Sequence, residues 1–258
     1  MGRINGYPGD KRALYFECGA GISGDMALGA LIHLGADAEA VKAELLKMDI
    51  GSFDLIPNCI SKNGIRGVEL DVIIRDESLR DAHAHVTYRH IKALIEGSGL
   101  SDNAKRMATN IFAVIGAAEA AVHGKNLDEV AFHEVGAPDS VIDIVGTAVA
   151  VDMMGVDRIC CGPVHDGCGF IECRHGIIPV PVPAVMEMLK RSDIPLVIET
   201  DVTTEMVTPT GFGILEGLKA EFLPTFGVRP ERIGYGFGKR DTGRFGAVRA
   251  ILGEEYAQ

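Results

Sequence analysis

The chain has little positive charge and no long apolar run, and both shortages exclude classes of protein. Its 258 residues contain 25 Lys and Arg against 36 Asp and Glu, which gives a net charge of −11. This balance argues against binding to nucleic acid or to an anionic lipid surface. No apolar run reaches the roughly 18 residues of a membrane span, and residues 1–11 lack the apolar core of a signal peptide. We therefore predict a cytoplasmic protein that binds no membrane.

The common catalytic motifs are also missing. The sequence has no Gly-x-Ser-x-Gly, no P-loop and no His-Glu-x-x-His, so the usual support for hydrolase and NTPase interpretations is absent. Six cysteines in a cytoplasmic protein are free thiols or metal ligands rather than disulfides. Four of them lie with two histidines within sixteen residues: Cys160, Cys161, His165, Cys168, Cys173 and His175. Because no Cys-x2-Cys pair occurs, buried free thiols are favoured here over a structural zinc site.

Hydrophobic residues make up 47% of the chain, enough for a sizeable core. Helical and strand patterns mix without a regular βαβ rhythm, so we predict an α+β fold with short mixed sheets. The patterns predict helices over 24–34, 37–48, 101–124, 139–154 and 184–191, a hairpin over 53–74, and strands over 13–16, 130–135, 196–202 and 247–252. We divide the chain into a disordered arm (1–11), an N-terminal α/β part (12–157) and a second α/β part (158–258).

A glycine-rich loop follows the first predicted strand. Its sequence is Gly19-Ala20-Gly21-Ile22-Ser23-Gly24-Asp25, and the helical pattern behind it stops at Gly35. Ser23 has the position and chemistry of a helix N-cap. Backbone N–H groups and the positive end of a helix can together bind a phosphate or carboxylate. A tight strand-to-helix turn with a capped helix is the alternative interpretation.

A second candidate site gathers one histidine and three carboxylates within eleven residues: His133, Glu134, Asp139 and Asp143. Imidazole and carboxylate groups suit a divalent metal or acid–base chemistry. The alternative is structural, because Ser140 and Asp143 have the spacing of a capping box and Asp139 would lie in the first turn of a helix.

Two further stretches allow both a functional and a structural interpretation. His83, His85 and His90 lie in or beside a polar linker and could chelate a metal, although solvated histidines are the simpler interpretation. Thr208-Pro209-Thr210-Gly211 predicts another helix start, which would be a second anion site or only a turn with a cap.

Taken together, these stretches resemble the nickel-insertion proteins of nickel-pincer cofactor biosynthesis, the LarC family. The resemblance runs from about Leu14 to Gly253. It rests on four motifs in the family's order: Gly21-Ile22-Ser23-Gly24-Asp25-Met26, Phe132-His133-Glu134-Val135-Gly136-Ala137 with Asp139 and Asp143, His175-Gly176-Ile177-Ile178-Pro179, and Thr208-Pro209-Thr210-Gly211.

The resemblance implies a cyclometallase of the lyase class, which inserts nickel into pyridinium-3,5-bisthiocarboxylic acid mononucleotide with hydrolysis of CTP. It also implies that CTP binds with Mn or Mg in a C-terminal domain that this chain lacks. The chain would then be the N-terminal part of a longer or split enzyme, with a C-terminal-domain partner, and we expect a homo-oligomer. The alternatives are a non-catalytic module that carries nickel or the nucleotide to a partner subunit, and a metal-dependent hydrolase built on the His133 cluster.

The resemblance and the chemistry of the side chains together suggest three sets of site residues. The expected catalytic residues are His133, Glu134 and Asp25. The expected anion- or nucleotide-binding residues are Gly19, Gly21, Ser23, Gly24, Thr208, Thr210 and Gly211. The expected metal ligands are His133, Glu134, Asp139, Asp143 and His175.

Overall fold

The computed structural model describes residues 12–76, 86–132 and 135–255. These residues form seven α-helices and ten strands. The helices are α1 (Gly24–Leu34), α2 (Ala38–Leu45), α4 (Tyr88–Glu96), α5 (Asp102–His123), α6 (Pro138–Met154), α7 (Pro183–Leu189) and α8 (Pro209–Gly217). The strands are β1 (Arg12–Cys18), β2 (Phe53–Lys62), β3 (Ile65–Ile74), β4 (Arg158–Asp166), β5 (Gly169–Cys173), β6 (Gly176–Val180), β7 (Leu196–Ile198), β8 (Glu221–Phe222), β9 (Val228–Phe237) and β10 (Ala247–Glu255).

Eight of these strands form one mixed sheet in the order β2-β3-β9-β10-β1-β4-β7, and β8 pairs with β4 outside that path. Strand β1 lies near the centre, antiparallel to β10 and parallel to β4. Strands β5 and β6 form a separate antiparallel hairpin. Strands from both sides of the boundary expected at residues 157 and 158 therefore pair within one sheet.

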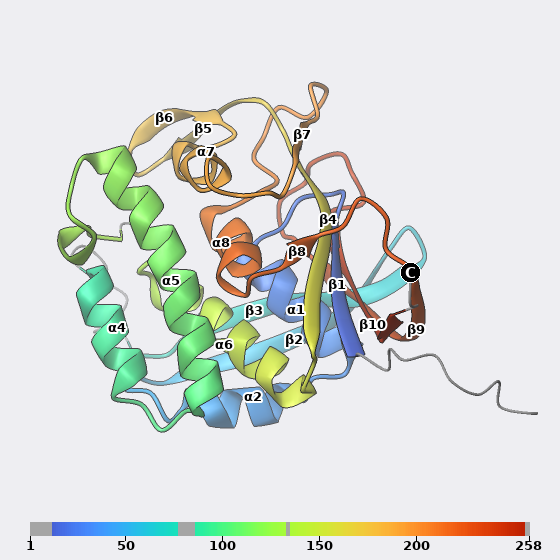
Figure 1. Cartoon of the computed structure of the whole chain (residues 1–258), viewed down its shortest axis with the longest axis horizontal. Coiled ribbons are helices and arrows are strands. Elements are labelled where there is room, and N and C mark those ends of the chain that lie inside the picture. The colour runs from blue at the N-terminus through green and yellow to red at the C-terminus, as the bar shows by residue number, and fades with distance from the viewer. Residues whose placement is uncertain (1–11, 77–85, 133–134, 256–258) are drawn as a thin grey trace, which may run out of the picture.

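The helices gather on one side of the sheet (Figure 1). Helix α1 packs on β9, β3 and β10, and α6 packs on α1, so α1 is enclosed between the sheet and a second layer of helices. Helix α5 crosses this layer and contacts α6, α7 and α8. Helices segregated on one face of a mixed sheet, without a regular βαβ repeat, define an α+β fold, which confirms the predicted class.

Several predicted helices and turns are confirmed, together with the residues that predicted where they begin or end. The Ser101 side chain accepts the N–H of Ala104 at the start of α5, and Gly124 ends that helix in the left-handed region at φ 62°. The turn between β2 and β3 is Asn63-Gly64, both at positive φ. Pro183 occupies the first turn of α7, as predicted.

Other predictions fail. No strand forms in the described part of residues 130–135. Ala131 makes only an isolated bridge with Thr87, and the preceding residues 127–129 form a 3₁₀ turn. The strand predicted over 196–202 ends at Ile198. Strand β9 was not predicted; its sequence contains an internal proline and two glycines, which weaken a strand signal.

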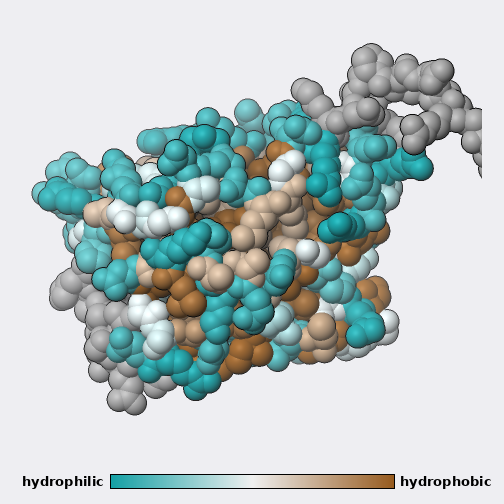
Figure 2. Space-filling model, turned by 90° about the horizontal axis from the view of Figure 1, so that it is seen from below, coloured by the Kyte–Doolittle hydropathy of each residue, from teal (hydrophilic) through white to brown (hydrophobic). Residues whose placement is uncertain are grey.

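The described helices include none that is both long and apolar enough to cross a membrane. On the side shown in Figure 2, hydrophilic residues surround hydrophobic ones that are divided into separate patches.

Candidate functional site

The glycine-rich loop and the segment before α8 lie side by side. The N–H of Ile22 donates to the carbonyl of Met206 at 3.0 Å, and the N–H of Thr208 donates to the carbonyl of Ile22 at 3.0 Å. These bonds form a short parallel bridge between Ile22 and Val207. Two motifs almost 190 positions apart in the sequence (Gly21 and Thr208) therefore bring the starts of α1 and α8 together.

Two glycines permit this close approach. A Cβ on Gly21, whose φ is +82°, would lie 2.0 Å from the carbonyl oxygen of Met206. A Cβ on Gly211 would lie 2.1 Å from the carbonyl oxygen of Ile22. No side chain fits at such distances, so both glycines are required by the contact between the two loops.

Asp166, at the end of β4, holds the second loop in place. Its Oδ1 accepts three backbone N–H groups: from Gly167 at 2.8 Å, Met206 at 2.7 Å and Val207 at 3.1 Å. The side chain is fully buried. Burial raises the pKa of Asp166, and the three N–H bonds oppose that rise.

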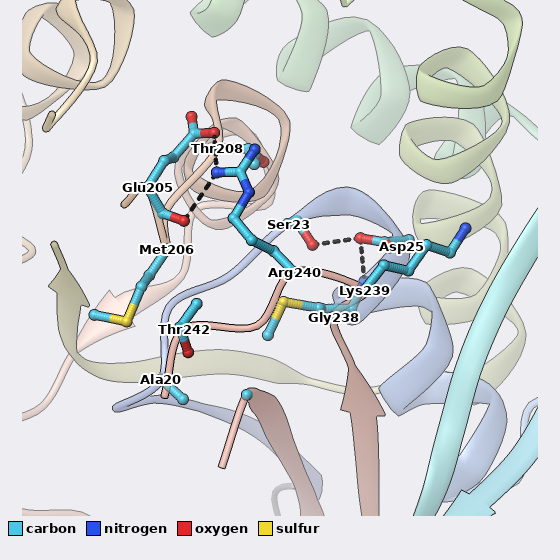
Figure 3. A pocket seen from close by; sticks show the side chains of 12 residues that line it. Ala20, Ser23, Asp25, Glu205, Met206, Thr208, Gly238, Lys239, Arg240 and Thr242 are labelled. Carbon is cyan, nitrogen blue, oxygen red and sulfur yellow. Dashed lines mark hydrogen bonds and ion pairs between the residues drawn. The ribbon is translucent and has the colours of Figure 1, made fainter. Parts of the chain in front are cut away.

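The loops border a cavity of about 240 Å³, here called the loop pocket, whose lining comes from the first loop, the segment before α8, and the turn after β9 (Figure 3). Its lining residues are Ala20, Ser23, Asp25, Met26, Glu205, Met206, Thr208, Gly238, Lys239, Arg240, Thr242 and Gly246. Three of the predicted nucleotide-site or catalytic residues, Ser23, Asp25 and Thr208, are among them.

Two cations line the loop pocket, and each has an acidic partner. The Arg240 guanidinium donates from Nη1 to the backbone oxygen of Glu205 at 3.0 Å and to its Oε2 at 2.9 Å. The Lys239 ammonium points away from Arg240 and lies 2.7 Å from Asp71 on β3 (Figure 3). Both side chains are about half exposed, at 49% for Arg240 and 50% for Lys239.

Helices α1 and α8 differ in which side chain accepts a backbone N–H group of the first turn. Ser23 is the N-cap residue of α1, as predicted, but its hydroxyl donates to Asp25 Oδ1 and accepts no backbone N–H of the first turn. Asp25 Oδ1 accepts the N–H of Met26 at 2.9 Å. At α8 the Thr208 hydroxyl accepts the N–H of Gly211 at 3.1 Å, which supports the turn-with-cap interpretation of that motif. First-turn N–H groups and the dipole nevertheless make both helix starts locally positive.

Asp143 joins this site from α6. Its side chain packs against the first turn of α1, where a Cβ on Gly24 would lie 2.9 Å from that of Asp143. Its Oδ1 is buried without a hydrogen-bond partner. Burial, and then the negative charges of Asp25 and Asp139, raise the pKa of Asp143 well above its usual range. The carboxyl therefore keeps its proton at a pH where an exposed aspartate has lost it.

The capping-box interpretation of Ser140 and Asp143 is wrong. Helix α6 begins earlier, with Ala137 as N-cap and Pro138 in its first turn. Asp139 is exposed, and its Oδ1 accepts the N–H of Ser140 at 2.9 Å. Asp139 lies on a surface hollow bordered by β3 and Arg174, and not on the loop pocket.

His175 lies in a second cavity of about 170 Å³, here called the histidine pocket. Its ring is 5.0 Å, centroid to centroid, from that of His123 at the end of α5. Glu119, Cys173 and Glu205 also line this cavity. Because Glu205 lines both cavities, the histidine pocket adjoins the loop pocket.

The structure thus brings the two glycine/threonine motifs together at the loop pocket and packs Asp143 against the first turn of α1. His175 lies in the adjoining histidine pocket. His133 and Glu134 lie outside the described residues, as do His83 and His85. The sequence patterns did not predict four residues that line the two pockets: Lys239, Arg240, Glu205 and His123. The pair Lys239-Arg240 does carry a signal, since it follows three alternating glycines, Gly234 and Gly236 in β9 and Gly238 just after it.

Within residues 12–76, 86–132 and 135–255, no three His, Cys, Asp or Glu side chains are grouped as a metal ion would require. The described part of the loop pocket therefore does not fit a closed Mn or Mg site. Its lining offers two cations and the starts of two helices, which together suit an anionic ligand.

Comparison with known proteins gives one consistent result. The family model described as nickel insertion protein matches residues 14–258. A protein of Acetivibrio thermocellus named pyridinium-3,5-bisthiocarboxylic acid mononucleotide nickel insertion protein is 49% identical over 94% of this chain and 60% of its own length. A Lactiplantibacillus plantarum protein with the same name is 46% identical over 95% of this chain and 62% of its own length. A putative nickel insertion protein of Wolinella succinogenes is 41% identical.

The chain spans about three fifths of the length of these curated relatives. No solved structure matches it.

Proposed function

Because the chain belongs to the nickel insertion protein family, we propose that it takes part in inserting nickel into pyridinium-3,5-bisthiocarboxylic acid mononucleotide. This is the compound in the names of its relatives from Acetivibrio thermocellus and Lactiplantibacillus plantarum. The observation that carries the proposal is the loop pocket, where two helix starts and two cations border one cavity.

The nucleotide is anionic at its phosphate and at both thiocarboxylates, whereas the chain has a net charge of −11. Binding therefore needs local positive potential. Helix starts supply it through backbone N–H groups, and Lys239 and Arg240 add full charges. A cavity of about 240 Å³ matches the phosphate-bearing part of a mononucleotide more closely than the whole molecule.

Insertion of nickel at a ring carbon requires removal of the proton on that carbon. We assign this acid–base work to Asp25 in the loop pocket, together with His133 and Glu134, which follow the buried Phe132 in the sequence. Asp143, held protonated beside Asp25, stores a proton close to the reacting groups. Asp139 is the weakest of the proposed metal ligands, since it lies outside the pocket.

Four other parts of the proposal extend beyond the residues described. CTP with Mn or Mg would drive the step, and the described residues offer no three-ligand site for that metal. A partner carrying the CTP site would complete the enzyme, and a homo-oligomer would be the working form. We place the reaction in the cytoplasm, which suits six free cysteines.

The test combines nucleotide binding with product formation. The chain is mixed with nickel, the nucleotide, CTP and Mg or Mn, with and without the remaining two fifths of the Acetivibrio thermocellus relative. Mass spectrometry then measures the nickel-bound nucleotide. We expect the product in the complete mixture, and we expect the chain alone to bind the nucleotide.

Lys239→Gln tests the site itself. We expect it to weaken nucleotide binding about tenfold, the cost of one charge-assisted contact. The matched control is Lys190→Gln, at the end of α7 and paired with Glu187, which should leave the affinity unchanged. Absence of nucleotide binding together with absence of product would overturn the proposal.

A non-catalytic carrier is the second candidate. It is favoured by the loop pocket, which offers cations and helix starts for binding an anion but no group of three metal ligands within the described residues. Tight nucleotide binding without product, even in the complete mixture, would select the carrier.

A further inference from the structure

The histidine pocket brings together two imidazoles from distant parts of the chain. His123 is the last residue of α5, and His175 lies in the turn between β5 and β6. Their ring centroids are 5.0 Å apart and their planes are inclined by 42°. With metal–nitrogen bonds of about 2.0–2.1 Å, two imidazoles that share one ion have centroids about 4.5–5 Å apart. The observed centroid separation lies within this range.

The surroundings of the two rings suit a transition metal. Glu119, one helical turn before His123, places Oε2 at 3.4 Å from His123 Nε2. A carboxylate that accepts the N–H of a ligating imidazole fixes its orientation and increases its basicity. Cys173 also lines the cavity, where its sulfur accepts the backbone N–H of His175 at 3.4 Å. Imidazole with nearby sulfur favours nickel, copper or zinc over magnesium or calcium.

The number of protein ligands is informative. Structural metal sites are closed by four protein ligands, whereas sites where the ion must react keep positions open. An ion that is delivered to a substrate needs open positions for the incoming sulfur atoms, and it must also leave. Two imidazoles that share one ion leave its other positions open to those sulfur atoms.

The position of the pocket fits delivery as well. Glu205 lines both the histidine pocket and the loop pocket, and Pro209 and Thr208 at the start of α8 line one each. We propose that His123 and His175 bind the nickel ion before its insertion, with Glu119 orienting His123, and that the ion passes from there to a nucleotide bound in the loop pocket. This inference rests on the proposed function, because nickel is the metal that function consumes.

The test is a titration of the chelator-treated full chain with nickel chloride alone, followed by calorimetry. We expect His123→Ala and His175→Ala each to weaken one nickel site about tenfold or more, and the double variant to abolish it. Glu119→Gln should weaken the same site by about tenfold, because it removes the carboxylate that orients His123. The matched control is His90→Ala, an exposed histidine on α4, which should leave this site unchanged.

His175 is exposed, so its substitution should not disturb folding, and circular dichroism of each variant checks this. X-ray absorption of the nickel-loaded chain should show two imidazole ligands, and both signals should disappear in the double variant. Unchanged nickel affinity in a folded double variant would overturn the inference.

Failure of this inference can be distinguished from failure of the proposed function. If the double variant still forms the nickel-bound nucleotide at the same nickel concentrations as the unsubstituted chain, the inference is wrong and the function stands. If the histidines bind nickel but the complete mixture forms no product, the site stands and the function is wrong.

Discussion

The loop pocket and the histidine pocket share Glu205, yet they are built in different ways. The loop pocket is shaped by backbone: two loops joined by main-chain hydrogen bonds, two glycines without room for a Cβ, and the buried Asp166. The histidine pocket is shaped by side chains at the end of a helix and at the turn of a hairpin, with His175 exposed.

This difference predicts which substitutions each pocket tolerates without unfolding. A backbone-defined site fails when its framework is disturbed, because the N–H groups that bind the ligand also hold the fold. A site made by exposed side chains can lose its ligand while the protein stays folded. Substitutions in the framework of the loop pocket should therefore reduce stability and binding together. Substitutions in the histidine pocket should reduce binding and leave stability nearly unchanged.

Gly21→Ala should give the largest loss of stability, about 4 kcal/mol, because the new Cβ would meet the Met206 carbonyl and the backbone has positive φ. Gly124→Ala is the matched control, with φ +62° and nothing within 4 Å of the added Cβ, and should cost only about 1 kcal/mol. Urea unfolding of both variants gives the comparison. Equal losses would mean that the two loops can separate without penalty.

Asp166→Ala should rank next, at about 3 kcal/mol, since it leaves three backbone N–H groups without an acceptor. Asp37→Ala removes a carboxylate that accepts two N–H groups at the exposed start of α2, and should cost about 1 kcal/mol. Thermal unfolding measures both. A loss at Asp166 no larger than that at Asp37 would contradict its role in holding the segment before α8.

Asp143→Asn should stabilise the chain at alkaline pH. The folded pKa of Asp143 is raised, so its contribution to stability is complete below the usual aspartate range and is lost as pH rises through the raised value. Asparagine imitates the protonated form, so the gain should grow with pH to about 1 kcal/mol, or about 2–4 °C in Tm.

Asp54 is the control, because its pKa is shifted in the direction opposite to that of Asp143. Its hydrogen bond from Arg75, and then that from Lys42, lowers its pKa, so Asp54→Asn should destabilise at neutral pH and become harmless in acid. Tm measured from pH 4 to pH 9 without metal tests both variants. Parallel pH profiles for Asp143→Asn and the unsubstituted chain would be incompatible with a raised pKa.

Thiol reactivity should separate the two regions without changing stability. Cys173 in the histidine pocket is only half-buried, whereas Cys18, at the end of β1 before the glycine-rich loop, is buried. Burial raises the pKa of Cys18 well above its usual range and that of Cys161 to about 12. At pH 8 a thiol reagent should modify Cys173 quickly and these two only after unfolding, as peptide mass spectrometry would show. Fast modification of Cys18 would indicate that the loop pocket opens easily.

How far the sequence predicts the molecule depends on how local each feature is. The α5 caps, the Asn63-Gly64 turn and the α+β class come from short-range patterns and were predicted. Strand β9 was missed because its glycines serve the packing of α1 against the sheet rather than strand propensity.

In the candidate site, too, features made by neighbouring residues were predicted and contacts between distant segments were not. The two helix-start motifs were predicted from their glycines and threonines, but their pairing through Ile22 was not, since it depends on a contact between distant segments. Arg240 and His123 could not be found from spacing, because each acts with a partner more than 30 positions away: Glu205 for the first and His175 for the second.

The central claim is that the loop pocket binds the anionic nucleotide. The most direct test is a crystal structure of the chain with pyridinium-3,5-bisthiocarboxylic acid mononucleotide. We expect an anionic group of the ligand within hydrogen-bonding distance of the first-turn N–H groups of α1 or α8 and close to Lys239 or Arg240. Density for the nucleotide elsewhere, with nothing bound between the two loops, would contradict it.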